Sequence, residues 1–125
     1  MEPGLAVNIF DLVKTFEDVL ERFKSRPTYD IDEEEVSVAS RIEFLRNMLV
    51  SVDRPVELLE VFERQGSARA LVATFLAVLE MVRMQAVLLR QSEMFGSIVV
   101  RKHKMFDVVF SEGGPLTAPD AEYTS

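Results

Sequence analysis

The spacing of apolar residues changes near residue 85, from helical spacing before it to strand-like runs after it. Because a helix repeats every 3.6 residues and a strand every two, the pattern predicts helices first and a small sheet last. The first helical segment runs from Asn8 to Lys24, and Asn8 is placed to cap it. Its apolar side comprises Ile9, Leu12, Val13, Phe16, Val19, Leu20 and Phe23. Charged residues fill most of the opposite side, so this helix is amphipathic.

Three further helices are expected before the change in spacing. The first covers Ser37 to about Val52 and the last covers Ser67 to about Met84, and each begins at a serine that can cap it. Between them, Val56–Gln65 fits a short helix that Gly66 ends. The inward side of the last helix is predicted to carry Leu71, Phe75, Val78 and Val82.

Two β-rich runs, Val87–Gln91 and Ser97–Arg101, flank a loop that contains a glycine. This arrangement predicts a β-hairpin. In its loop we expect Phe95 to pack inward and Gly96 to take a positive φ, which glycine adopts without steric cost. Residues 102–110 fit either a third strand or a loose extension.

The order of these elements is typical of a winged helix-turn-helix. A short extended piece, Thr28–Ile31, precedes the helices, the last two helices meet at a tight Gly66–Ser67 turn, and the hairpin is the wing. We therefore expect a mainly α fold with a small β-hairpin, namely a winged helix-turn-helix preceded by an extra amphipathic helix. The predicted parts are an N-terminal helix and linker (1–27), the winged-helix domain (28–110) and a flexible C-terminal tail (111–125).

The charge and residue types exclude several classes of function. A formal net charge of -7 disfavours tight nucleic-acid binding, because neutralising phosphates requires a basic surface. The basic cluster Arg101–Lys104 is weak, and His103 within it is expected to be solvated. Without cysteine or a second histidine there is no zinc site, and the acidic run Asp30–Glu35 fits helix capping better than calcium binding. We predict no catalytic, cofactor-binding or metal-binding residues, and therefore no enzyme.

The chain offers no candidate for a membrane segment or a secretion signal. Its densest apolar stretch, Ala68–Val82, is interrupted by Arg69, Thr74 and Glu80. The N-terminus has no basic region followed by an apolar run. We therefore expect a cytoplasmic protein that contacts no membrane.

The last predicted helix is poorly suited to reading DNA. Its charged residues, Arg69, Glu80 and Arg83, lie within about 60° of one another around the helix axis. Apolar Val72 and Leu76 lie beside them, and an apolar patch rimmed by charge usually marks a protein interface. The alternative is that the first helix covers this patch. The predicted partner-binding residues are Arg69, Val72, Leu76, Leu79, Glu80 and Arg83.

Several stretches resemble the C-terminal signature of one protein family. They are Glu35–Val38 followed by Arg41–Ile42, Thr74–Met81, Gln91, and Phe95–Ile98. In this order and spacing they resemble bacterial segregation and condensation protein A, the kleisin subunit of the chromosome-condensing SMC complex. The similarity covers most of the chain.

The resemblance implies a partner and a place in the cell. The C-terminal winged helix of such a kleisin docks on the ATPase head of an SMC protein, and the complex associates with the nucleoid. Segregation and condensation protein B is implied as a further partner. The chain lacks the N-terminal neck-binding domain and most of the middle region, so we expect a fragment or a shortened member.

Two functions from different classes follow. One is a non-catalytic kleisin-type adaptor that docks on an SMC head. The alternative is a winged-helix DNA-binding transcriptional regulator. The net charge of -7 and the apolar outer side of the last helix favour the adaptor.

Overall fold

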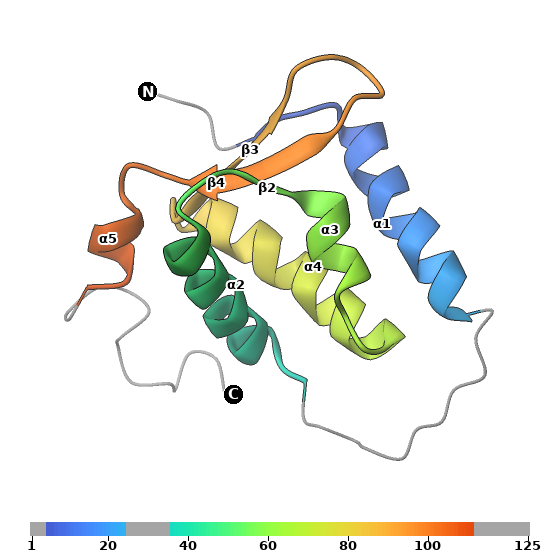
Figure 1. Cartoon of the computed structure of the whole chain (residues 1–125), viewed down its shortest axis with the longest axis horizontal. Helices are drawn as coiled ribbons and strands as arrows, with labels where there is room; N and C mark the ends of the chain where they lie inside the picture. The colour runs from blue at the N-terminus through green and yellow to red at the C-terminus, as the bar shows by residue number, and fades with distance from the viewer. Residues whose placement is uncertain (1–4, 25–35, 112–125) are drawn as a thin grey trace.

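The computed structural model describes residues 5–24 and 36–111, which form a mainly helical fold with a small mixed sheet (Figure 1). Its elements are β1 (Leu5–Ala6), α1 (Ile9–Lys24), α2 (Val38–Val52), β2 (Val56–Glu57), α3 (Leu58–Glu63), α4 (Ala68–Arg83), β3 (Val87–Gln91), β4 (Ile98–Lys102) and α5 (Phe106–Val109). The predictions for Thr28–Ile31, for the acidic run Asp30–Glu35 and for the C-terminal tail fall wholly or almost wholly outside the described residues.

The predicted starts of the three long helices are confirmed by their capping hydrogen bonds. Asn8 Oδ1 accepts from the Asp11 backbone N–H at 3.2 Å, and Ser67 Oγ accepts from the Ala70 N–H at 3.1 Å. Ser37 forms a capping box with Ser40, in which each side chain accepts from the other residue's N–H. These side chains satisfy donors that the first helical turn leaves unpaired.

The predicted hairpin is confirmed, but it lies within a larger sheet. The strand order is β1-β3-β4-β2, with β1 parallel to β3 and the other two pairs antiparallel. The prediction of helix from residue 56 is wrong, because Val56 and Glu57 pair with Val100 and Val99 of β4. The short helix α3 therefore begins only at Leu58. At these two residues, pairing with a distant strand outweighs the local helical pattern.

Residues 102–110 are neither a third strand nor a loose extension, because they contain the short helix α5. Phe106 and Val109 of α5 are buried. The prediction of a solvated His103 is also wrong. Its side chain is buried, and Nδ1 accepts from the Met105 N–H at 2.9 Å, while its own backbone N–H donates to the Ala86 carbonyl at 2.9 Å. His103 therefore organises the turn between β4 and α5.

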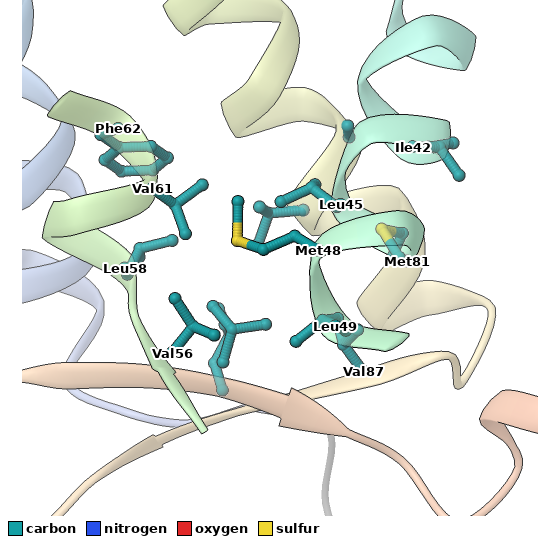
Figure 2. Packing of buried hydrophobic residues seen from close by; sticks show 14 of the residues in the cluster. Ile42, Leu45, Met48, Leu49, Val56, Leu58, Val61, Phe62, Met81 and Val87 are labelled. Atoms are coloured by element: carbon teal, nitrogen blue, oxygen red, sulfur yellow. The ribbon is translucent and has the colours of Figure 1, made fainter. Parts of the chain in front are cut away.

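The core lies between the helices and one face of the sheet (Figure 2). Figure 2 shows α3 (Leu58, Val61, Phe62) facing α2 (Leu45, Met48, Leu49), with Val56 of β2 and Val87 of β3 toward the sheet. On helix α4, Leu71, Val78 and Met81 are fully buried.

The predicted buried faces of α4 and α1 are too wide, because residues at their edges are only half-buried or exposed. On α4, Leu71 and Val78 are buried as predicted, whereas Phe75 and Val82 are only half-buried. On α1 the buried strip is centred on Leu12, Val19 and Phe23. Ile9 and Val13 lie on the border of that strip and are exposed.

Candidate functional site

The outer side of α4 carries the six predicted partner-binding residues, here called the α4 surface: Arg69, Val72, Leu76, Leu79, Glu80 and Arg83. At about 100° per residue these positions share one side of the helix. Val72 is 40% exposed and Leu76 is 47% exposed, while Leu79 is half-buried and packs against the core. Arg83 Nε donates to Glu80 Oε1 at 2.9 Å, and Arg69 is exposed. The structure thus brings two exposed aliphatic side chains together with an ion pair and a further arginine.

Helix α1 packs beside this surface but does not bury it. Phe16 of α1 stacks on Phe75 of α4 with ring centroids 4.5 Å apart, and both rings meet Phe62 of α3 edge-on. This aromatic cluster joins three helices and covers the side of α4 next to the α4 surface. Because Val72 and Leu76 remain exposed, the alternative in which the first helix covers the patch is wrong.

A second group of polar contacts, here called the latch, ties α1 to the hairpin. The buried Asp11 carboxylate accepts, through Oδ2, from Gln91 Nε2 at 2.8 Å and from the Phe95 N–H at 2.7 Å. Gln91 Nε2 also donates to the Gly96 carbonyl at 3.1 Å, and Gln91 Oε1 accepts from the Asn8 N–H at 2.8 Å. The latch residues Asn8, Asp11 and Gln91 therefore fix the start of α1 against the end of β3 and the loop that follows it.

The loop between β3 and β4, residues 92–97, departs from the prediction made for it. Phe95, not Gly96, takes the positive φ, at 65°, and its side chain is 85% exposed instead of packed. Gly96 is needed for a different reason, because a Cβ there would lie 3.0 Å from the carbonyl oxygen of Glu93. The turn of the chain at Gly96 brings its backbone against that carbonyl, and the latch then holds Phe95 in its unusual conformation.

The latch was missed from the sequence. Asp11 reads as an ordinary first-turn acid of an amphipathic helix, where the helix dipole favours negative charge. Gln91 is among the residues that resemble the family, but the sequence assigns it no role, and it lies 80 residues from its partner Asp11. The available signal was a polar residue, Gln91, at the end of a strand that begins with three apolar residues.

Within residues 5–24 and 36–111, no three His, Cys, Asp or Glu side chains are grouped as a metal site would require. Among the helices of those residues, none is long and apolar enough to cross a membrane. The described surface does expose apolar side chains, among them Val72 and Leu76 on α4 and Phe95 in the hairpin loop.

Comparison with known proteins decides the family. The family model described as "Segregation and condensation protein ScpA" matches residues 1–102. The chain belongs to the ScpA family. That match includes α1, the α4 surface, the latch and the hairpin, and it ends at the last residue of β4.

Curated relatives in the ScpA family match over the same length. Segregation and condensation protein A of Bacillus velezensis is 32% identical over 101 residues, and the proteins of the same name from Bacillus subtilis and Bacillus licheniformis are 31% and 30% identical. Each alignment covers 79% of this chain but only 40% of the relative. The chain thus spans about 40% of the length of the ScpA proteins it matches. No solved structure matches it significantly.

Proposed function

We propose that the chain is the winged-helix module of a kleisin and docks, through the α4 surface, on the ATPase head of an SMC protein. In this role it is a non-catalytic adaptor in chromosome segregation and condensation. It acts in the cytoplasm at the nucleoid, with segregation and condensation protein B in the same assembly. The observation that carries the proposal is the exposure of Val72 and Leu76 beside the Glu80–Arg83 ion pair. Together with membership of the ScpA family, it favours a protein partner.

The element order from α2 onward supports a winged helix. The elements α2, β2, α3, α4, β3 and β4 follow one another, and β2 pairs antiparallel with β4 beside the β3–β4 hairpin. In this order α3 and α4 correspond to the helix-turn-helix pair, and α4 takes the position of the recognition helix. Helix α1 is then the extra element in front.

The same recognition helix argues against the transcriptional regulator. Helices that read DNA offer Arg, Lys, Asn or Gln to base edges and phosphates. On its outer side α4 offers Arg69 and Arg83, and Arg83 is paired with Glu80. Helix α1 also connects α4 with the hairpin loop, because Phe16 stacks on α4 and Asp11 bonds the loop. The comparisons offer no support for the regulator.

Leu76→Glu tests the proposal, because it places a charge at the centre of the α4 surface. Leu76 is 47% exposed, so the variant should fold, as judged by circular dichroism. Central residues carry most of the energy of an interface, and the loss of affinity for a purified SMC head should reach about 30-fold or more. Val50→Glu is the matched control, because Val50 is an exposed aliphatic residue on α2. Normal binding by a folded Leu76→Glu protein would place the interface elsewhere.

A further inference from the structure

Most of the exposed large hydrophobic side chains in the described residues belong to a few elements of the fold. In residues 5–24 and 36–111 they are Leu5, Ile9, Phe10, Val13, Val50, Val72, Leu76, Met94, Phe95 and Val108. All but Val50 and Val108 belong to β1, α1, the α4 surface or the hairpin loop. The two most exposed, at 85% each, are Phe10 and Phe95. Phe10 is next to Asp11 in the chain, and Asp11 accepts a hydrogen bond from Phe95 itself.

The conformation of Phe95 costs the domain energy and leaves the residue 85% exposed. A positive φ is a genuine outlier for a bulky residue, and Phe95 has a φ of 65°. The latch nevertheless enforces it, through the Phe95 N–H bond to Asp11 and the two hydrogen bonds that Gln91 Nε2 donates. Strain that the surrounding contacts maintain in this way is characteristic of binding sites.

We infer that Phe95, together with Phe10, is a second anchor for the partner. These side chains enter an apolar pocket on the partner, and basic side chains surround that pocket. This inference rests on the proposed function, since it assigns the anchor to the same SMC head that covers the α4 surface. Aromatic side chains make strong anchors, and a backbone that is already fixed before binding reduces the conformational freedom lost on association. Asp11 and Gln91 are positioning residues that act through Phe95.

The distances allow one partner to cover both the α4 surface and the anchor formed by Phe10 and Phe95. Phe10 and Phe16 are six residues apart on α1, which is about 9 Å along a helix. Phe16 contacts Phe75 of α4, and the turn next to Phe10 bonds the hairpin loop. A standard interface covers about 800 Å² on each partner, or roughly 30 Å across. Val13 of α1 is exposed as well.

The charges around Phe95 favour a basic rim on the partner. A hollow of about 260 Å³ beside Phe95 is lined by Asp18, Glu57 and Arg22, among others. Arg22 forms an ion pair with Glu63 at 2.7 Å, and Glu93 is exposed within the loop. With Lys14, which pairs with Asp18, included, four acidic side chains (Asp18, Glu57, Glu63, Glu93) face two basic ones (Lys14, Arg22). This excess of negative charge disfavours nucleic acids and anionic lipid and favours a protein surface carrying Lys or Arg.

Phe95→Gly separates the anchor from the fold. Glycine accepts a φ of 65° without strain, so the loop and the latch should keep their structure and the melting temperature should stay level or rise. The affinity for a purified SMC head, measured by calorimetry with the full chain, should fall about 10- to 100-fold. Val108→Ala, at an exposed aliphatic residue of α5, should bind normally.

A double-mutant cycle tests the positioning role. Asp11→Ala should weaken binding in the wild-type background but have little further effect in Phe95→Gly, because the anchor it positions is already absent. Independent, additive losses would overturn the positioning role, and a lower melting temperature in Phe95→Gly would show a structural role for Phe95.

The outcomes separate this inference from the proposed function. If Phe95→Gly binds the head normally while Leu76→Glu does not, the second anchor is wrong and the proposed function stands. If the wild-type chain does not bind the head, the proposed function fails, and the assignment of the anchor to the head fails with it. Loss of affinity in both variants, with both folded, supports the two together.

Discussion

Asp11→Ala removes the carboxylate that joins α1 to the hairpin loop. It deletes two hydrogen bonds to a charged acceptor, from Gln91 Nε2 at 2.8 Å and from the Phe95 N–H at 2.7 Å. Hydrogen bonds to charged groups contribute about 1.5–3 kcal/mol each. Since the loop lies at the surface, water can replace part of the lost hydrogen bonding. We therefore expect a net loss of about 2–3 kcal/mol in the free energy of unfolding. For a chain of 125 residues this lowers the melting temperature by about 10 °C.

Thermal denaturation followed by circular dichroism measures this loss, and Asp18→Ala is the control. Asp18 is also on α1, but it is exposed, and its carboxylate pairs with the exposed Lys14 at 3.4 Å. An exposed pair of this kind contributes little, so the control should melt within about 2 °C of wild type. Hydrogen exchange at the Phe95 amide should accelerate in Asp11→Ala and remain slow in the control. Equal melting temperatures for the two variants would refute the view that the latch holds the loop.

Two further predictions concern Gly96 in the hairpin loop and the negative net charge of the chain. Gly96→Ala should cost about 1–2 kcal/mol in a urea titration, because the new Cβ would lie 3.0 Å from the Glu93 carbonyl oxygen. Gly66→Ala, where a Cβ meets nothing within 4 Å, should be neutral or slightly stabilising, and a reversed order would contradict the close approach at Gly96. In a fluorescence anisotropy titration at physiological salt, duplex DNA should bind with a dissociation constant weaker than about 1 µM, whereas specific binders reach about 10⁻⁸ M. Tighter, steeply salt-dependent binding would favour the regulator.

The features that could be predicted from the sequence are local ones. Asn8, Ser37 and Ser67 each cap the helix that follows, and a cap depends on residues within one turn. The side of α4 that carries Val72 and Leu76 follows from their angle around a single helix, whereas their exposure depends on how α1 packs. The hairpin follows from two adjacent runs and a short loop.

The features that could not be predicted depend on partners far along the chain. Val56 becomes a strand residue because it pairs with Val100, and β1 exists only because Leu5 pairs with Leu89. A two-residue strand has no period that a sequence pattern could reveal. The Asp11–Gln91 bond spans 80 residues, and it is this bond, with the Phe95 N–H, that sets which residue of the loop takes the positive φ.

Site-specific photo-crosslinking can show directly whether the α4 surface touches the SMC head. A benzophenone amino acid would replace Leu76 in one protein and Val50 in the other, both exposed aliphatic positions on long helices. After irradiation with a purified SMC head, the probe at position 76 should form a covalent adduct with the head, and the probe at position 50 should not. An adduct from position 50 and none from position 76 would contradict docking through the α4 surface.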